Sequence, residues 1–237
     1  MTSFTIDDIR EIQSFIGLNL DGFAESGLKL ETDDDLLAWR DWLSSQPESQ
    51  KVVGTQDPVG NLIPGDAGFW VRIEEHGKIV ACHAFRMIET RSLLQDIMTW
   101  RIISNRRPLV HIDPIPLRPN VPDLSGRIGF GGGAYVHPGQ RGRRLYRPMS
   151  RITWALGLRH YDLDWYAAFY RQTPQLRAAS RSALFRNLGP LMNDIWPPHG
   201  VPLELNLAFM SRQEMLTTIR SHTGSGTDDG SAVYRIA

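Results

Sequence analysis

Several residue types are scarce in this sequence, and each shortage excludes a class of protein. Among its 237 residues there is one cysteine, Cys82, which can form no disulfide within the chain and no zinc site with other cysteines. No stretch approaches about 18 uninterrupted apolar residues, so the sequence predicts no membrane span. The first residues lack the basic and apolar regions of a secretory signal. We therefore expect a soluble, cytoplasmic protein.

Metal ligands at useful spacings are also missing. The seven histidines include no His-x-x-x-His pair, so we expect no metal site. His83 follows Cys82 directly, but neighbouring residues of a strand point to opposite faces and form no catalytic pair by themselves. We interpret Cys82 as a small buried thiol of the core.

Lysine is scarce as well, because arginine supplies all but three of the 26 basic side chains. The chain also has 26 acidic side chains, so its formal net charge is zero, but the charges are unevenly distributed. Residues 1–75 hold 15 acids and 5 bases, and ten arginines lie from Arg141 to Arg186. A GC-rich genome would explain the preference for arginine but not its position. Arginine suits phosphate recognition, so the second half of the chain indicates a phosphorylated ligand.

The chain divides into three parts. Residues 1–53 contain two helical patterns, one capped by Thr5 and one that begins after the acidic run Asp33–Asp35, and we expect them to form an N-terminal helical extension. Residues 54–220 form the main domain. The composition of residues 221–237 predicts a flexible tail.

The main domain alternates between strand and helix patterns. Residues 54–68 are rich in glycine and proline and predict a linker or long loop, and five prolines make residues 105–126 an irregular insertion. The apolar patterns predict strands at 69–73, 79–85, 127–136, 165–170 and 201–210, and helices at 91–103, from Arg144–Tyr146 onward, and at 174–188.

The most informative segment joins the strand 127–136 to the helix after it. A strand, a turn rich in glycine and arginine, and a helix N-terminus together bind anions, because the first N–H groups of a helix have no partner and its dipole is positive there. Arg141, Arg143 and Arg144 add charged side chains at this turn. A plain basic surface turn, or a contact to nucleic-acid phosphates, would have the same pattern.

The segment Val136–Leu145 (VHPGQRGRRL) resembles the acyl-CoA-binding segment of the GNAT acetyltransferase superfamily. In that family a strand ending in Val-x-Pro leads into an Arg-Gly-x-Gly-x-Gly/Ala pyrophosphate loop that opens a helix. A hairpin with a Gly-Lys turn at 77–78 precedes the segment, and residues 178–189 are similar to the family's Asn-x-x-Ala-x-x-Leu-Tyr-x-x-x-Gly helix. The resemblance covers about residues 66–212.

The resemblance implies an α+β fold in which helices flank a central mixed, mostly antiparallel sheet. It implies an acyl-CoA-dependent N-acyltransferase, with an N-acetyltransferase as the first candidate. The implied cofactor is acetyl-CoA or another acyl-CoA, and the implied mechanism is direct attack of an amine on the thioester. The cofactor-binding residues that it implies are Val136, Gln140, Arg141, Gly142, Arg143, Arg144 and Leu145.

Such a reaction needs a base for the amine and an acid for the leaving thiolate. The strand 127–136 carries no carboxylate, so the candidates for the base are His137 and Tyr135, which are otherwise a turn residue and a core aromatic. The candidates for the acid are Tyr170, otherwise a plain strand-end aromatic, and Ser182 on the following helix.

The chain departs from the family pattern at three positions. Arg144 stands where the family has glycine, Tyr146 where it has glycine or alanine, and Phe185 where many members carry a tyrosine that acts as general acid. Arg144 either replaces lost amide contacts with its charged side chain or blocks the pyrophosphate. The alternative function is therefore a catalytically inactive module of this fold that senses CoA or binds a protein or a nucleic acid.

The acidic N-terminal part favours a cationic acceptor, so the expected partner is a small-molecule or peptide amine. Zero net charge and the lack of a helix–turn–helix or RNP-like motif count against nucleic acid. The sequence leaves a homodimer open and fixes neither the acceptor nor the length of the acyl chain.

Overall fold

The computed structural model of the chain describes residues 4–49, 54–63, 67–103, 115, 117, 119–171, 183–196 and 201–224. Its helices and strands follow in the order α1 (Ile6–Glu25), β1 (Leu28–Asp33), α2 (Leu36–Ser45), β2 (Gly68–Glu75), β3 (Lys78–Thr90), α3 (Leu93–Met98), β4 (Gly126–Val136), α4 (Tyr146–Tyr161), β5 (Trp165–Arg171), β6 (Asn187–Trp196), β7 (Val201–Ser211) and α6 (Arg212–Thr223). A short 3-10 helix, η1 (Pro138–Gln140), lies between β4 and α4.

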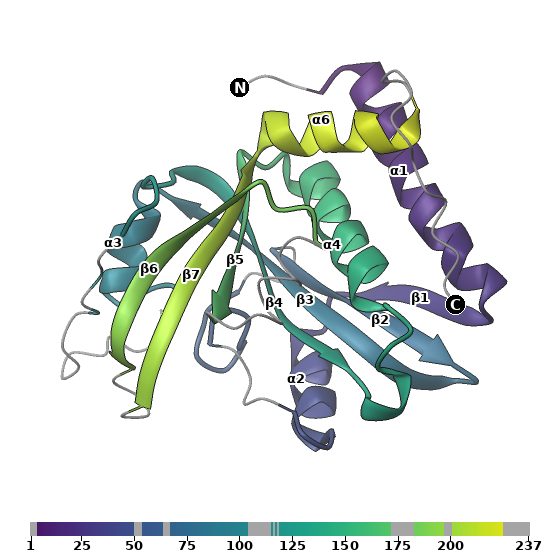
Figure 1. The fold of residues 1–237 in the computed structure, drawn as a ribbon, viewed down its shortest axis with the longest axis horizontal. Coiled ribbons are helices and arrows are strands. Elements are labelled where there is room, and N and C mark those ends of the chain that lie inside the picture. The colour runs from purple at the N-terminus through teal and green to yellow at the C-terminus, as the bar shows by residue number, and fades with distance from the viewer. Residues whose placement is uncertain are drawn as a thin grey trace.

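One seven-stranded sheet runs through the molecule in the order β1-β2-β3-β4-β5-β7-β6 (Figure 1). Neighbouring strands are antiparallel except β4 and β5, which are parallel. The helices cover both faces of this sheet. This arrangement confirms the predicted fold class, a mixed and mostly antiparallel sheet flanked by helices.

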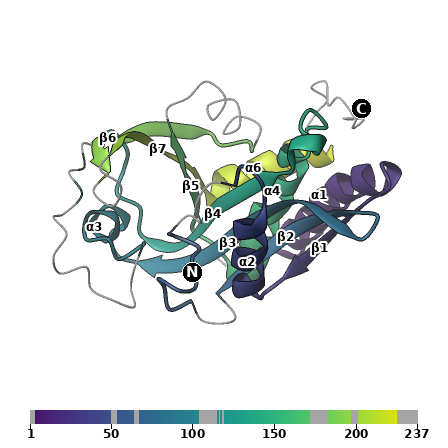
Figure 2. The same ribbon diagram turned by 90° about the horizontal axis from the view of Figure 1, so that it is seen from below.

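The two faces of the sheet carry different helices. α1, α4 and α6 pack together on one face, and α2 and α3 lie on the other (Figure 2). Strand β3 shows the alternation that makes this possible, since Cys82 and Ala84 belong to the core under α2 whereas His83 and Phe85 face α4. The prediction that Cys82 and His83 point to opposite faces is confirmed, and Cys82 is fully buried.

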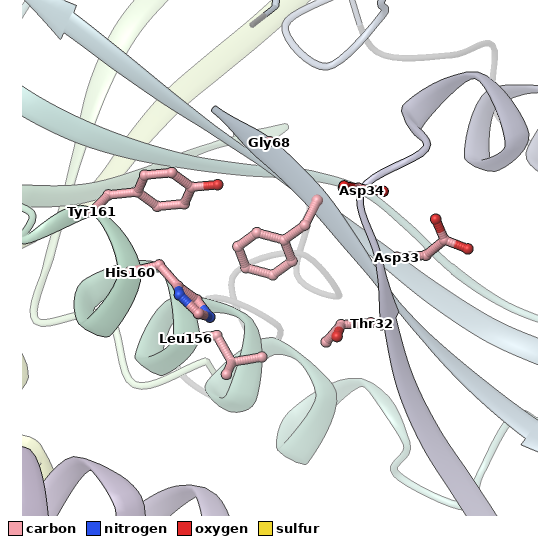
Figure 3. A pocket seen from close by; sticks show the side chains of 8 residues that line it. Thr32, Asp33, Asp34, Gly68, Leu156, His160 and Tyr161 are labelled. Carbon is pink, nitrogen blue, oxygen red and sulfur yellow. The ribbon is translucent and has the colours of Figure 1, made fainter. Parts of the chain in front are cut away.

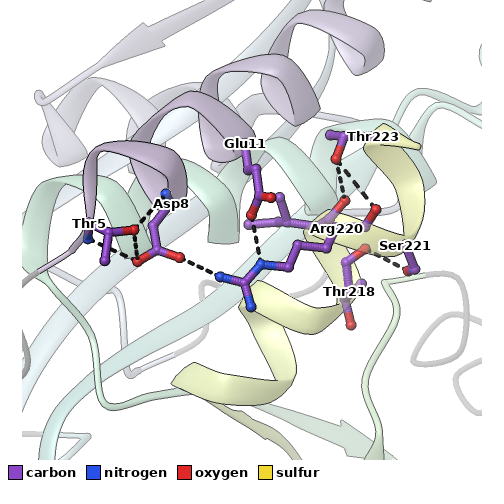
Figure 4. Close-up of polar contacts among 8 residues, drawn as sticks. Thr5, Asp8, Glu11, Thr218, Arg220, Ser221 and Thr223 are labelled. Atoms are coloured by element: carbon purple, nitrogen blue, oxygen red, sulfur yellow. Dashed lines mark hydrogen bonds and ion pairs between the residues drawn. The ribbon is translucent and has the colours of Figure 1, made fainter. Parts of the chain in front are cut away.

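The first and last helices are tied together by charge. Thr5 caps α1 as predicted, because its hydroxyl accepts the N–H of Asp8 while the Asp8 carboxylate accepts the N–H of Thr5. Arg220 of α6 donates to Asp8 at 2.6 Å and to Glu11 at 2.8 Å (Figure 4). This network holds α6 against α1.

Residues 54–63 pack against the sheet as a closed loop and not as a linker. Gln56 is fully buried, and its amide donates to the carbonyl oxygen of Phe130 in β4 at 3.1 Å. The amide of Asn61 donates to the carbonyl oxygens of Gly54 at 2.6 Å and of Ile103 at 3.0 Å. The loop therefore covers β4 on the face opposite α4.

The N-terminal part differs from the sequence prediction. β1 lies between the two predicted helices and pairs with β2, so residues 1–53 supply a strand to the sheet as well as helices. The predicted helix at 91–103 is shorter in the structure. It ends at Met98, and Trp100 then adopts a φ of +65°, which a helix cannot continue through.

The C-terminal part differs as well. The predicted helix at 174–188 is wrong at its end, where β6 begins at Asn187; residues 172–182 lie outside the described structure. Pro190 is tolerated in β6 because this is an edge strand with a register shift beside the proline. Residues 221–223, predicted as the start of the tail, form the last turn of α6. The capping box between Ser211 and Glu214 was the sequence signal for that helix.

Candidate functional site

The loop between β4 and α4 leaves several backbone N–H groups without acceptors. Gly142 has a φ of +96° and Arg144 a φ of +58°, so the chain passes twice through left-handed backbone conformations before α4 starts at Tyr146. Leu145 holds the N-cap position, but it is buried in the core and supplies no side-chain cap. Across the described residues, the N–H groups of Gly142, Arg144, Leu145 and Tyr146 make no hydrogen bond. These donors and the positive end of α4 can hold an anion.

Two of the three arginine side chains of the loop are paired with carboxylates. Nη1 of Arg141 lies 2.8 Å from Oε2 of Glu48, and Nη1 of Arg143 lies 2.7 Å from Oε1 of Glu75. Gln140 also donates to Glu75, at 2.6 Å, and the hydrogen bond from Arg143 lowers the pKa of that carboxyl. These two ion pairs fasten the loop to the acidic N-terminal part, and the backbone amides remain as the anion donors.

Arg144→Gly is expected to stabilise the protein. A non-glycine residue in the left-handed region costs about 1–2 kcal/mol, and the added freedom of glycine in the unfolded chain offsets about 0.4–1 kcal/mol of the gain. The midpoint of thermal unfolding should therefore rise by about 1–4 °C. The control is Arg159→Gly in the last turn of α4, which should lower the midpoint because glycine weakens a helix. If the midpoint of thermal unfolding of Arg144→Gly is equal to or below that of the wild type, the backbone at Arg144 is not strained.

Next to this loop the strands β4 and β5 separate. They pair only over Ile128–Gly131 and Trp165–Ala168, and they diverge toward the loop (Figure 1). We call the ends that do not pair with each other, Gly132–Val136 of β4 and Phe169–Arg171 of β5, the β4–β5 splay. A register shift between β4 and β3 falls in the same stretch, where Gly133 adopts a φ of +58°.

A pair of tyrosines bridges the splay. Oη of Tyr170, at the end of β5, lies 2.7 Å from Oη of Tyr146 in the first turn of α4. Tyr170 is buried, and burial raises its pKa well above its usual value. Because its hydroxyl is bonded to Tyr146, the predicted acid is already engaged within the protein. Ser182, the other candidate for the acid, lies outside the described residues.

The two candidates for the base have partners of their own. The Tyr135 hydroxyl donates to the carbonyl oxygen of Pro47 at 2.9 Å, on the face that carries α2. Nδ1 of His137 accepts the N–H of Gly139 at 3.2 Å and so caps η1. Val136 pairs with β3. The structure therefore brings these residues to the end of β4 without bringing their reactive atoms together.

A buried histidine lies beside the end of the β4–β5 pairing. Nδ1 of His83 is 3.2 Å from Oγ1 of Thr153, which itself donates to the carbonyl oxygen of Met149, so the histidine nitrogen is the donor. Burial lowers the pKa of His83 to about 4, so its ring is neutral at pH 7. A Cβ atom placed on Gly131 would lie 3.3 Å from Cε1 of this ring.

Tyr166 completes the group on the same face. A Cβ atom on Gly131 would collide with Oη of Tyr166, so glycine is needed there to make room for the hydroxyl. The sequence analysis selected neither Tyr166 nor His83. The signal that could have found Tyr166 is its spacing from Tyr170, because residues four apart in a strand lie on one face.

A separate pocket of about 470 Å³ lies at the other end of α4 (Figure 3). Asp34, Phe69, His160 and Tyr161 are among its lining residues, as is Asp33, which is held by an ion pair to β2. The rise of a helix places this pocket about 15–22 Å along α4 from the helix start. It is therefore no part of the loop site.

The described parts of the chain contain no helix that is both long and apolar enough to cross a membrane. Within the same parts, no three histidine, cysteine or acidic side chains come together as metal ligands.

Comparison with known proteins gives similarity at the level of structure only. No protein-family model and no curated protein matches the sequence. One similar solved structure is the ribosomal-protein-S18-alanine N-acetyltransferase from Escherichia coli, with 8% sequence identity and a TM-score of 0.46; the match covers 78% of this chain and 93% of that chain. Another is a polyamine N-acetyltransferase from Drosophila melanogaster, with 12% sequence identity and a TM-score of 0.45; the match covers 78% of this chain and 99% of that chain. A third is the ribosomal-protein-S5-alanine acetyltransferase from Vibrio fischeri (10%, TM-score 0.38), and the match covers 62% of each chain, less than two thirds of that enzyme's length. These likenesses concern the course of the chain and assign no role to any residue of this protein.

Proposed function

We propose that the protein is an acyl-CoA-dependent N-acyltransferase in which an amine directly attacks the thioester of acyl-CoA and takes over the acyl group. An acetyl group is the first candidate for this acyl group. The observation that carries this proposal is the start of α4. Four N–H groups there, at Gly142 and at Arg144–Tyr146, have no acceptor among the described residues and lie at the positive end of the helix. The loop that leads into α4 follows β4, the strand that diverges from its parallel neighbour β5.

The residues of this loop fit the pyrophosphate of CoA. The amides of Gly142, Arg144, Leu145 and Tyr146 supply the donors, and Gly142 has open space where a side chain would otherwise stand. Gln140, Arg141 and Arg143 hold the loop in this shape through Glu48 and Glu75. The end of β4 that does not pair with β5, Gly132–Val136, is the natural course for the pantetheine arm, and the thioester supplies an activated acyl group.

An amine is the acceptor class that this site favours. Residues 1–75 hold 15 acids against 5 bases; Glu48 and Glu75 among them are already neutralised by arginines of the loop, so the attraction comes from the remaining excess of acids. A small-molecule or peptide amine would be drawn to such a surface, since opposite charges steer association. Its proton can leave through water, because Tyr135 and His137 each use a polar atom within the fold.

One observation favours the alternative, a CoA-binding module without catalysis. The hydrogen bond between Tyr146 and Tyr170 crosses the splay, and Tyr146 stands where the GNAT pattern that the sequence resembles has glycine or alanine. Binding of acetyl-CoA without turnover of any amine would select this alternative.

The proposal is tested by calorimetric titration with acetyl-CoA, in the wild type and in Arg144→Glu. The substituted carboxylate would compete for the free amides and repel the phosphates, so the affinity should fall about 10- to 100-fold, on the scale of charge-assisted hydrogen bonds. The matched control is Arg159→Glu, the same charge change at the opposite end of α4. An equal loss in both variants, or none in either, would remove the loop from the proposed site. Turnover is then measured by thiol release in a screen of amines.

A further inference from the structure

The pocket at the last turn of α4 lies between segments that are far apart in the sequence. Thr32 and Asp34, at and just after the end of β1, lie across the space from His160 of α4 (Figure 3). The start of β2 supplies Phe69 as a further lining residue. With a volume of about 470 Å³, the pocket falls in the size range of small-molecule sites, about 300–1,000 Å³.

The pocket is separated from the β4–β5 splay. The ring of Phe85, which is fully buried, stacks against Phe69 of the pocket with centroids 4.7 Å apart. On its other side it lies parallel to Tyr166 of β5 at 6.4 Å. Glycine at positions 129 and 157 gives this ring its space, because a Cβ atom at either position would collide with it. A molecule in the pocket is therefore shut off from a thioester held along the splay.

The charges around the pocket favour a cation. The carboxylate of Asp34 makes no ion pair or hydrogen bond among the described residues. Next to it, the two cations Lys29 and Arg72 are shared among three carboxylates. These are the side chains of Glu31, Asp33 and Glu74. The end of β1 therefore carries an excess of negative charge, and Asp34 brings part of it to the pocket.

Two further features of the pocket suit an organic cation. α4 ends at Tyr161, so the negative end of its dipole lies beside the pocket. The rings of Phe69 and Tyr161 are nearly parallel, with planes 9° apart and centroids at 6.5 Å, and both line the pocket. Aromatic rings attract cations through the negative charge of their faces, and they also take up an apolar body. Leu156 adds an aliphatic side chain.

We propose that this pocket binds an arylalkyl ammonium ion, at a site separate from the one proposed for acyl-CoA. The ammonium group donates to the carboxylate of Asp34 and to the hydroxyl of Thr32, and the aromatic body lies against Phe69 and Tyr161. The inference does not depend on the acyltransferase function, because none of these residues belongs to the loop before α4 or to the splay.

The test compares two probes of similar shape, phenethylammonium and the neutral phenethyl alcohol. Both are titrated by calorimetry without acyl-CoA at a pH of about 7, where the amine is protonated. The wild type should bind the ammonium ion about 10-fold more tightly than the alcohol. Asp34→Asn should weaken binding of the ammonium ion about 3- to 5-fold and leave that of the alcohol unchanged. The matched control is Asp21→Asn, the same change at an exposed residue of α1 outside the pocket, which should alter neither affinity.

A second variant, Thr32→Trp, locates the binding site. Thr32 is exposed and tryptophan suits a strand, so the variant should fold, while its indole fills the pocket and abolishes binding of both probes. Equal affinities of the wild type for the two probes, or no binding of either, would overturn the proposal. An equal loss in Asp34→Asn and Asp21→Asn would do so as well. Binding that persists in Thr32→Trp would place the probe elsewhere and overturn the proposal too. The titrations contain no acyl-CoA, so each of these results leaves the proposed function standing.

Discussion

Gly133→Ala is expected to lower the free energy of unfolding by about 2–5 kcal/mol. Gly133 has a φ of +58°, which costs an alanine about 1–2 kcal/mol. Its Cβ atom would also run into the indole of Trp39, a fully buried side chain of α2, and overpacking of this kind costs about 1–3 kcal/mol. The loss is measured by urea unfolding monitored by circular dichroism.

The matched control for this prediction is Gly27→Ala. Gly27 has a φ of +68° but open space around it, so only the backbone term applies there. The difference between the two variants isolates the contact with Trp39. If both substitutions cost the same, the indole does not constrain the register shift of β4.

The second large effect is a loss of stability in acid through His83. Its pKa is about 4 in the folded protein, against 6.5 for the free group, because burial opposes the charged ring. Between these values the unfolded chain binds more protons than the folded one, so stability is complete above a pH of about 6.5 and falls as the pH drops toward 4. The lost stability amounts to about 3 kcal/mol at the rate of 1.36 kcal/mol per pKa unit.

Urea unfolding of the wild type and His83→Asn at several pH values checks this prediction. The asparagine amide can still donate to Thr153, so the variant keeps that hydrogen bond and loses the titrating ring. Its stability should change less between pH 7 and 4 than that of the wild type. The exposed His160 serves as the control, and His160→Asn should follow the wild-type curve. Parallel curves for the wild type and His83→Asn would contradict the assignment to His83.

Much of the candidate site could be predicted from the sequence because its signals are local. The glycines and the periodic apolar residues of the segment 126–156 place a strand, a turn and a helix start, and the structure has them there. Arg144, which stands where the family that the sequence resembles has glycine, adopts the left-handed conformation that glycine favours. The free amides of the turn are a consequence of this local geometry.

Other features were decided by contacts between distant segments. Nothing near Arg141 or Arg143 in the sequence indicates that Glu48 and Glu75 bind them, since these acids arrive from the turn after α2 and from the end of β2 only when the sheet forms. The same holds for β6, whose pairing with β7 overrides a helical pattern and a proline.

The sequence by itself determined the strand, the turn and the helix start around the loop. Only the tertiary structure decided which tyrosine of β5 has its hydroxyl bonded to α4. Tyr166 and Tyr170 are equivalent by position in the strand, but α4 brings Tyr146 to one of them and leaves the other above Gly131. The physical reason is that a hydrogen-bond partner is fixed by packing in three dimensions, whereas periodicity records only which face of an element is buried.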